Sequence, residues 1–177
     1  MSFTFKRLEI PEVILVDAQE FPDERGYFLE SFKESIFTNN GINTKFIQDN
    51  FSHSVKGVLR GLHYQKNPKA QGKLVIALRG EIFDVAVDIR KNSPTFLQWH
   101  SEILTADKGN SLFISEGFAH GFQTLTNNCE LLYMHSNFYS QEAEGALNAF
   151  DPKINISWPL EVTEISDRDR NIPLIDK

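Results

Sequence analysis

A chain of 177 residues with 41% hydrophobic and 24% charged residues has the composition of an ordinary globular protein with a real core. Its formal net charge of −6 argues against a nucleic-acid-binding protein, which would carry a basic face, but permits a small anionic ligand held by a local basic cluster. The single cysteine excludes an intrachain disulfide, and no signal peptide or membrane span is evident, so we expect one cytoplasmic domain over residues 1–177.

The N-terminal segment DERGYFLESF, residues 23–32, has charged residues on both sides of an aromatic pair. By itself this pattern is typical of a charged turn that enters a strand, with Arg25 and Glu30 in solvent. The overlapping stretch 31–41 predicts a helix, because it ends at Gly41 and glycine commonly terminates helices.

The segment GVLRGLHYQ, residues 57–65, predicts a half-buried strand that carries two ionisable side chains. Simple alternation places Arg60 and His63 on opposite faces, but Gly61 between them permits a bulge that would re-aim one of them. Unpaired charge is costly to bury, and an arginine on a mostly apolar strand usually meets an anion. These two residues therefore either have structural partners or point into a site.

Period-two alternation predicts further strands in KLVIAL, IFDVAVDIR, SLFIS and CELLYMHSNFY. In the second of these, one face carries Phe83, Val85, Val87 and Ile89, and the other carries Asp84, Ala86 and Asp88. Lys73 begins the first of them, where a lysine usually marks a solvated edge. Many short strands with turns between them predict an all-β sandwich or barrel with minor helix, the second short helix lying near SDRDR.

The segment SEGFAHGF, residues 115–122, predicts a tight turn. Gly117 and Gly121 indicate a close approach of two backbones, and we expect His120 at a rim rather than buried.

Several kinds of chemistry are disfavoured by the motifs. Metal-binding barrels often carry an H-x-H pair, whereas His63 is followed by Tyr64 and Gln65, so no metal is expected. Nucleophile elbows, phosphate-binding loops and dinucleotide fingerprints are also missing from the sequence, so we expect neither nucleophilic catalysis nor a role for NAD or ATP. Acid–base chemistry remains, with a histidine oriented by a carboxylate. Asp169 could be that carboxylate, the alternative being a solvated charged tail.

Taken together and in this order, the segments resemble the dTDP-4-dehydrorhamnose 3,5-epimerases of L-rhamnose nucleotide biosynthesis. The specific motifs are VLRGLH, GEIFDVAVDIR and EGFAHGF, and the resemblance runs from about residue 5 to residue 175. It implies a cupin-type jelly roll with a few short peripheral helices, acting as a homodimer without metal or cofactor. The implied substrate is dTDP-4-keto-6-deoxyglucose, whose C4 ketone acidifies the protons on both C3 and C5.

The resemblance also implies roles for individual residues. His63 is the general base and Asp169 its carboxylate partner. Tyr133 is the acid on the opposite face of the sugar, and Lys73 stabilises the enolate at the C4 oxygen. Positions implied to contact the nucleotide sugar are Arg25, Glu30, Gln48, Asp49, Asn50, Arg60, His120, Tyr139 and Glu144. Among these, Arg60 would meet the diphosphate and Tyr139 would stack on the thymine ring.

Two departures from the family pattern are visible. Arg168 stands where the family usually has lysine, which would keep the charge at the ligand but change its geometry. Ser115 stands where the family often has proline. The alternatives are an epimerase of one centre or of another 4-keto nucleotide sugar, a binding module without catalysis, and a metal-dependent cupin enzyme. The presence of His63, Tyr133 and Lys73 favours catalysis.

Overall fold

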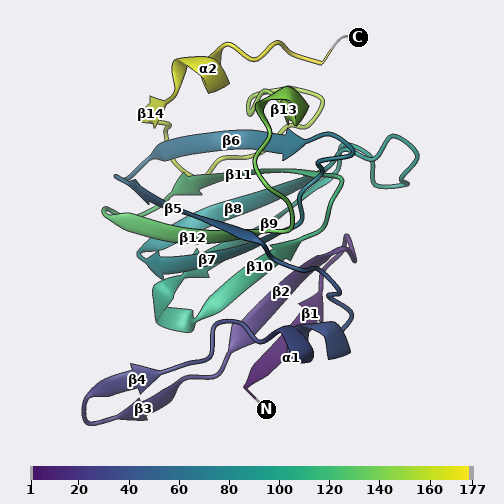
Figure 1. Ribbon diagram of the computed structural model, residues 1–177. Coiled ribbons are helices and arrows are strands. Elements are labelled where there is room, and N and C mark those ends of the chain that lie inside the picture. Colours follow the sequence, from purple (N-terminus) through teal and green to yellow (C-terminus); the bar gives the residue numbers. More distant parts are fainter. Residues whose placement is uncertain (1, 176–177) are drawn as a thin grey trace.

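The computed structural model describes residues 2–175 and confirms the all-β prediction, because two sheets face each other in a jelly roll (Figure 1). The first sheet has the strand order β1 (Phe3–Arg7), β2 (Val13–Ala18), β10 (Asn110–Ile114), β7 (Lys73–Arg79), β12 (Cys129–His135) and β5 (Gln48–Ser54). The second has the order β13 (Glu144–Ala146), β6 (Val58–Gln65), β11 (Phe118–Thr124), β8 (Glu81–Asp88) and β9 (Trp99–Thr105). A short strand, β14 (Glu164–Ile165), adds to β6 in parallel.

The remaining elements lie around this barrel. A hairpin of β3 (Phe21–Asp23) and β4 (Gly26–Phe28) projects away from it (Figure 1). Helices α1 (Glu34–Asn39) and α2 (Asp167–Arg170) confirm the two predicted positions, and 3-10 helices cover Ala106–Lys108 and Gln141–Ala143. Neither α-helix in the described part of the chain is long and apolar enough to cross a membrane.

The residues at the helix ends explain where the two α-helices begin and end. Helix α1 begins later than the predicted range because Lys33, the residue before it, is extended, and the chain leaves the helix through Gly41 at φ +86°. Helix α2 begins at a serine cap, since the Ser166 hydroxyl accepts a hydrogen bond from the Asp169 backbone N–H at 3.1 Å. This cap holds the Asp169 backbone in the first turn of the helix.

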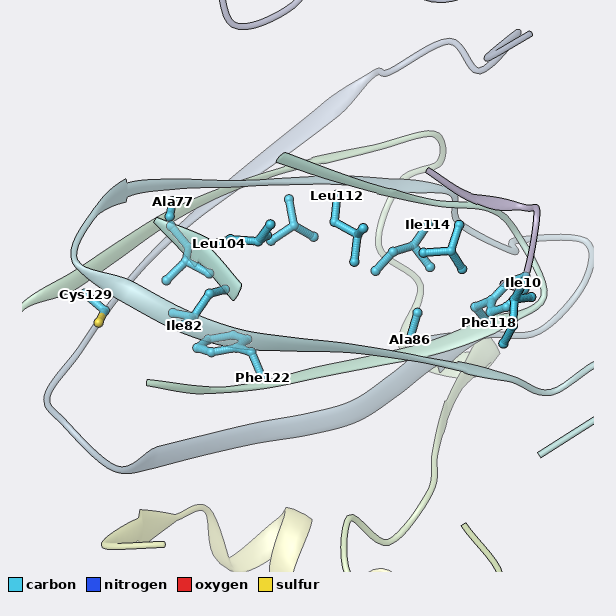
Figure 2. Close-up of a cluster of buried hydrophobic side chains, with 13 residues drawn as sticks. Ile10, Ala77, Ile82, Ala86, Leu104, Leu112, Ile114, Phe118, Phe122 and Cys129 are labelled. Carbon is cyan, nitrogen blue, oxygen red and sulfur yellow. The ribbon is translucent and has the colours of Figure 1, made fainter. Parts of the chain in front are cut away.

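The two sheets enclose an apolar core built from the inward positions of the strands (Figure 2). Its buried members include Val75, Ile82, Ala86, Leu104, Leu112, Ile114, Phe118, Phe122 and Leu131. The predicted alternation in β8 is confirmed, because Ala86 faces this core while Val85 and Val87 pack outward against the C-terminal segment. Burial of β8 on both faces leaves Asp84 and Asp88 fully inaccessible to solvent.

Candidate active site

Strand β6 contains a bulge next to Gly61, the position at which the sequence permits one. Strand β11 pairs with β6 through His120 with His63 and Phe122 with Arg60, so three steps along β6 face two along β11. Gly61 makes this possible, since a Cβ there would lie 2.6 Å from the backbone of β11. The extra residue turns Arg60 and His63 to the same side, where both line one cavity.

This cavity has a volume of about 560 Å³ and is lined by residues of β5, β6, β7, β11 and β12, together with β14 and α2. Its inner wall carries ionisable side chains from several strands and from α2, namely His63, Lys73, His120, Tyr133, His135 and Asp169. Its solvent-exposed part is lined by Asn50, Arg60 and Arg168. The structure therefore brings all four sequence-predicted catalytic residues together around one space.

His63 and Asp169 form a hydrogen-bonded pair at the wall of the cavity. The His63 Nε2 lies 2.7 Å from Asp169 Oδ1, and Asp169 Oδ2 accepts from the Gly61 backbone N–H at 3.2 Å. Burial works to raise the pKa of Asp169, but the hydrogen bonds and charge of its neighbours, His63 first, outweigh burial and lower it. Asp169 is therefore a carboxylate, and it leaves His63 Nδ1 as the nitrogen available to a ligand.

Lys73 is a buried cation on the facing wall. Its side chain is 7% exposed, and its Nζ donates to the His63 carbonyl at 3.3 Å. Desolvation lowers the pKa of Lys73 to about 8, although the charge of Asp84 acts in the opposite direction. Lys73 is therefore charged near neutral pH and close to losing its proton at mildly basic pH.

The structure corrects the expectation that His120 lies at a rim. His120 sits in β11 between β6 and β8 and is 5% exposed, because Gly121 permits close strand packing rather than a turn. Its Nε2 lies 2.7 Å from Asp84 Oδ1. Desolvation lowers the pKa of His120, although the charge of Asp84 acts in the opposite direction. The lowered pKa favours a neutral imidazole.

Asp84 is a residue that the sequence did not assign to the site. The signal was available, since a carboxylate on a buried apolar strand calls for a partner in the same way as Arg60 did. Its Oδ2 has no hydrogen-bond partner among residues 2–175, and its charge acts on both Lys73 and His120. Asp84 therefore balances the cation of Lys73 inside the barrel.

Tyr133 and His135 lie two residues apart on the face of β12 that lines the cavity. The Tyr133 hydroxyl is hydrogen-bonded to Ser52 Oγ on β5, and the ring lies 6.2 Å from that of His120. Burial raises the pKa of Tyr133 to about 12, so the phenol is protonated. His135, which was not assigned a role, is 7% exposed, and burial beside Lys73 lowers its pKa to about 4.

Five predicted ligand residues form a network beside the open part of the cavity. Arg168 on α2 lies 2.8 Å from Glu144, whose carboxylate also accepts from the Tyr139 hydroxyl at 3.2 Å. Gln48 accepts from the Tyr139 backbone N–H at 2.9 Å and donates to Asn50 at 3.0 Å. The network ties α2, and with it Asp169, to β13 and β5.

Three predicted ligand residues are not part of this arrangement. Arg25 lies in the β3–β4 turn, with a side chain that is 90% exposed and 2.5 Å from Asp23. Glu30 follows the same hairpin and lies 3.6 Å from Lys33. Asp49 alternates with its neighbours in β5 and so points to the other face of the strand. None of the three is part of the cavity wall.

The carboxylates of Asp84 and Asp169 each face a histidine. Across residues 2–175, no group of three or more histidine, cysteine, aspartate or glutamate side chains is arranged to hold a metal ion. The two histidine–carboxylate pairs at the cavity have neighbouring imidazoles, since His63 and His120 are partners in the β6–β11 register.

The fold and the cavity place this protein in the class of cupin-type jelly rolls. The interior of its barrel carries the ionisable groups described above. The family model for dTDP-4-dehydrorhamnose 3,5-epimerase matches residues 7–177. The chain belongs to this family of isomerases.

Individual relatives support the assignment along the whole chain. It is 50% identical over 166 residues to the dTDP-4-dehydrorhamnose 3,5-epimerase of Shigella flexneri, covering 93% of this chain and 92% of the relative. The Bacillus anthracis enzyme, solved with TDP and PPi bound, is 40% identical with a TM-score of 0.94 over 98% of this chain and 99% of that one. The Legionella pneumophila enzyme, solved with dTDP-4-keto-L-rhamnose, is 43% identical with a TM-score of 0.93 over 97% and 92%.

Proposed function

We propose that this enzyme inverts C3 and C5 of dTDP-4-keto-6-deoxy-D-glucose to give dTDP-4-keto-L-rhamnose, by proton transfer through an enolate. The observation that carries the proposal is the His63–Asp169 pair, 2.7 Å apart, in one cavity with Lys73 and Tyr133. The Legionella relative was solved with the product of this same reaction, which supports the choice of substrate.

The chemistry begins with removal of a proton next to the C4 ketone. His63 Nδ1 takes the proton, and the Asp169 carboxylate on Nε2 stabilises the imidazolium that forms. Negative charge then develops on the C4 oxygen, where the buried ammonium of Lys73 stabilises it more strongly than a solvated cation would. His63 and Lys73 lie on facing sheets, so a sugar ring between them can meet both.

Inversion needs a proton from the opposite face of the sugar. Tyr133 is a protonated phenol on β12, across the cavity from His63 on β6. It delivers this proton to the carbon, first at one centre and then at the other. A base on one face and an acid on the other invert a centre, whereas a single base would return the proton where it came from.

The open part of the cavity fits the nucleotide end of the substrate. Arg60 and Arg168 supply positive charge for the diphosphate, and the exposed ring of Tyr139 supplies a stacking surface for thymine. Arg60 is held by Ser54, whose hydroxyl accepts from its Nε at 3.1 Å. The protein therefore orients the Arg60 guanidinium before a ligand binds.

Replacing Arg60 with alanine is expected to weaken dTDP binding about 10- to 100-fold, because a charge-assisted hydrogen bond contributes about 1.5–3 kcal/mol. Isothermal titration calorimetry with dTDP measures this directly. The matched control is Arg79→Ala, since Arg79 is an exposed arginine outside the cavity wall. An unchanged affinity in the Arg60 variant would assign this residue to the fold instead.

We further propose that the enzyme works as a homodimer in which the β3–β4 hairpin of each copy reaches the cavity of the other. The hairpin projects from its own barrel (Figure 1) and exposes Tyr27 at 56% and Phe28 at 66%. Exposed aromatic side chains of this kind are typical of an interface. The pairing would bring Arg25 and Glu30 to a substrate that they cannot contact within their own chain.

Mixing two defective variants tests this pairing. Arg25→Ala and His63→Ala should each be poorly active alone, yet co-expressed chains should recover up to about a quarter of wild-type activity, because a mixed dimer has one cavity with both residues intact. Activity of the purified co-expressed mixture, checked for size by sedimentation, gives the result. A mixture no more active than the sum of its parts would show that Arg25 serves its own chain or none.

The reaction itself is tested by trapping. Incubation of dTDP-4-keto-6-deoxyglucose with the enzyme, a 4-keto-sugar reductase and NADPH is expected to give dTDP-L-rhamnose, identified by proton NMR. A product with inversion at one centre, or no product above the rate without enzyme, would contradict the proposed reaction.

A further inference from the structure

The hydroxyl of Tyr133 has a specific hydrogen-bond partner on the neighbouring strand. It is hydrogen-bonded to Ser52 Oγ, which comes from β5, the neighbour of β12 in the first sheet. Ser52 alternates with Asn50 along β5 and so faces the same side of the sheet as Tyr133. In the described part of the chain, β5 is the last strand of this sheet.

Ser52 and Tyr133 are both half-buried, and Ser52 is the hydrogen-bond partner of the Tyr133 hydroxyl. Tyr133 is packed against Phe122, His120 and His135, with ring centroids 6.1–6.2 Å away. Ser52 keeps part of its surface exposed, near the edge of the sheet. The hydrogen bond between the two hydroxyls gives a proton a direct path from Ser52, near the sheet edge, to the Tyr133 oxygen.

Double inversion creates a need for such a route. If Tyr133 gives its proton to the first carbon, it is left as a phenolate and cannot protonate the second carbon until it is reloaded. Burial makes that phenolate unfavourable, since it raises the pKa of Tyr133, whereas the hydrogen bond to Ser52 and the charge of Arg60 act in the opposite direction. Ser52 thus stabilises the state that Tyr133 occupies between the two inversions.

We propose that Ser52 is a positioning residue for Tyr133, which orients the phenol toward the sugar and returns a proton to it between the two inversions. This inference rests on the proposed function. In each cycle the Tyr133 O–H bond breaks as the new C–H bond forms, and the Ser52 O–H proton passes to the phenolate oxygen. Ser52 takes a proton from water, and His63 releases to solvent the proton it removed from the sugar, so the protons balance.

Three variants separate this role from simple packing. Ser52→Ala removes the hydroxyl, and Ser52→Thr keeps it. The control is Ser111→Ala, which removes a serine hydroxyl from the same sheet. The Ser111 hydroxyl donates to the Val16 carbonyl and lies outside the cavity wall. Each is incubated with dTDP-4-keto-6-deoxyglucose in deuterated water, and NMR follows singly and doubly inverted products. Thermal unfolding confirms that each variant folds.

For Ser52→Ala we expect the rate of doubly inverted product to fall about 10-fold or more with KM changed less than about 2-fold, and the singly inverted sugar to accumulate. Ser52→Thr should recover most of the rate, and Ser111→Ala should match wild type. The tyrosinate absorbance of Ser52→Ala should also appear at higher pH than in wild type, because the phenolate has lost a donor.

Two results would overturn the role of Ser52 while leaving the proposed function intact. One is a Ser52→Ala enzyme with the wild-type rate and product ratio. The other is an equal loss of deuterium exchange and inversion that Ser52→Thr does not restore, as expected for damage to the fold. Absence of exchange in wild-type protein would instead overturn the proposed function, and this inference with it.

Discussion

Replacing His63 with alanine is expected to lower kcat by about 10²- to 10⁴-fold, the range for loss of a general base, while dTDP affinity changes less than about 2-fold. The reason is geometric. His63 Nε2 is occupied by Asp169, so Nδ1 is the atom available to take the sugar proton. The neighbouring His120 is held by a different carboxylate, because its Nε2 is bonded to Asp84. The nucleotide end of the cavity, which includes Arg60, is left untouched.

Exchange of both sugar protons with deuterated solvent measures this loss directly, and calorimetry with dTDP measures what is retained. His100→Gln is the matched control, because His100 also pairs with a carboxylate, Glu102 at 3.0 Å, but lies outside the cavity wall. Substantial residual exchange at either carbon in the His63 variant would require a second base and would refute the single-base mechanism.

Lys73→Met is expected to lower kcat by about 10²- to 10³-fold, the effect of removing one preorganised group that stabilises a developing oxyanion. Methionine fills a similar volume without the charge, so thermal unfolding should report a folded variant. The loss should fall on kcat rather than on dTDP affinity, because Lys73 is placed to act at the C4 oxygen. An unchanged kcat would show that enolate stabilisation comes from another group.

The same lysine predicts the basic side of the pH profile. Its pKa is lowered to about 8, so the ammonium is present below that pH and is lost above it. Wild-type kcat should therefore fall as pH rises through about 8, while Tyr133, with a pKa of about 12, keeps its proton. In Lys73→Met this decline should disappear, and its persistence there would assign it to a different group.

The sequence predicts strands well where burial differs between the two faces. In β8 the alternating sets were confirmed, since Val85 and Val87 pack outward and Ala86 packs inward. The close backbone approach predicted at Gly121 is confirmed, since a Cβ there would lie 2.7 Å from the Arg60 carbonyl oxygen on β6. The predicted extent of the turn is wrong, because β11 already begins at Phe118, and so His120 is buried within a strand rather than at a rim.

Pairings across strands depend on register, which a single sequence does not specify. The bulge at Gly61 decides that Arg60 and His63 share a face, and alternation alone would have separated them. Asp84 and Ser52 acquire their partners only when β8 lies beside β11 and β5 beside β12. The role implied for Arg25 depends on more than one chain's fold, because within its own chain Arg25 pairs with Asp23 in the β3–β4 turn and lies outside the cavity wall.

Proton NMR of dTDP-4-keto-6-deoxyglucose incubated with the enzyme in deuterated water tests the central claim most directly. The proposed mechanism predicts deuterium at both C3 and C5, with inversion at each centre. Deuterium at C3 alone would contradict double inversion and make the protein a mono-epimerase, and no exchange above the uncatalysed rate would contradict catalysis on this substrate.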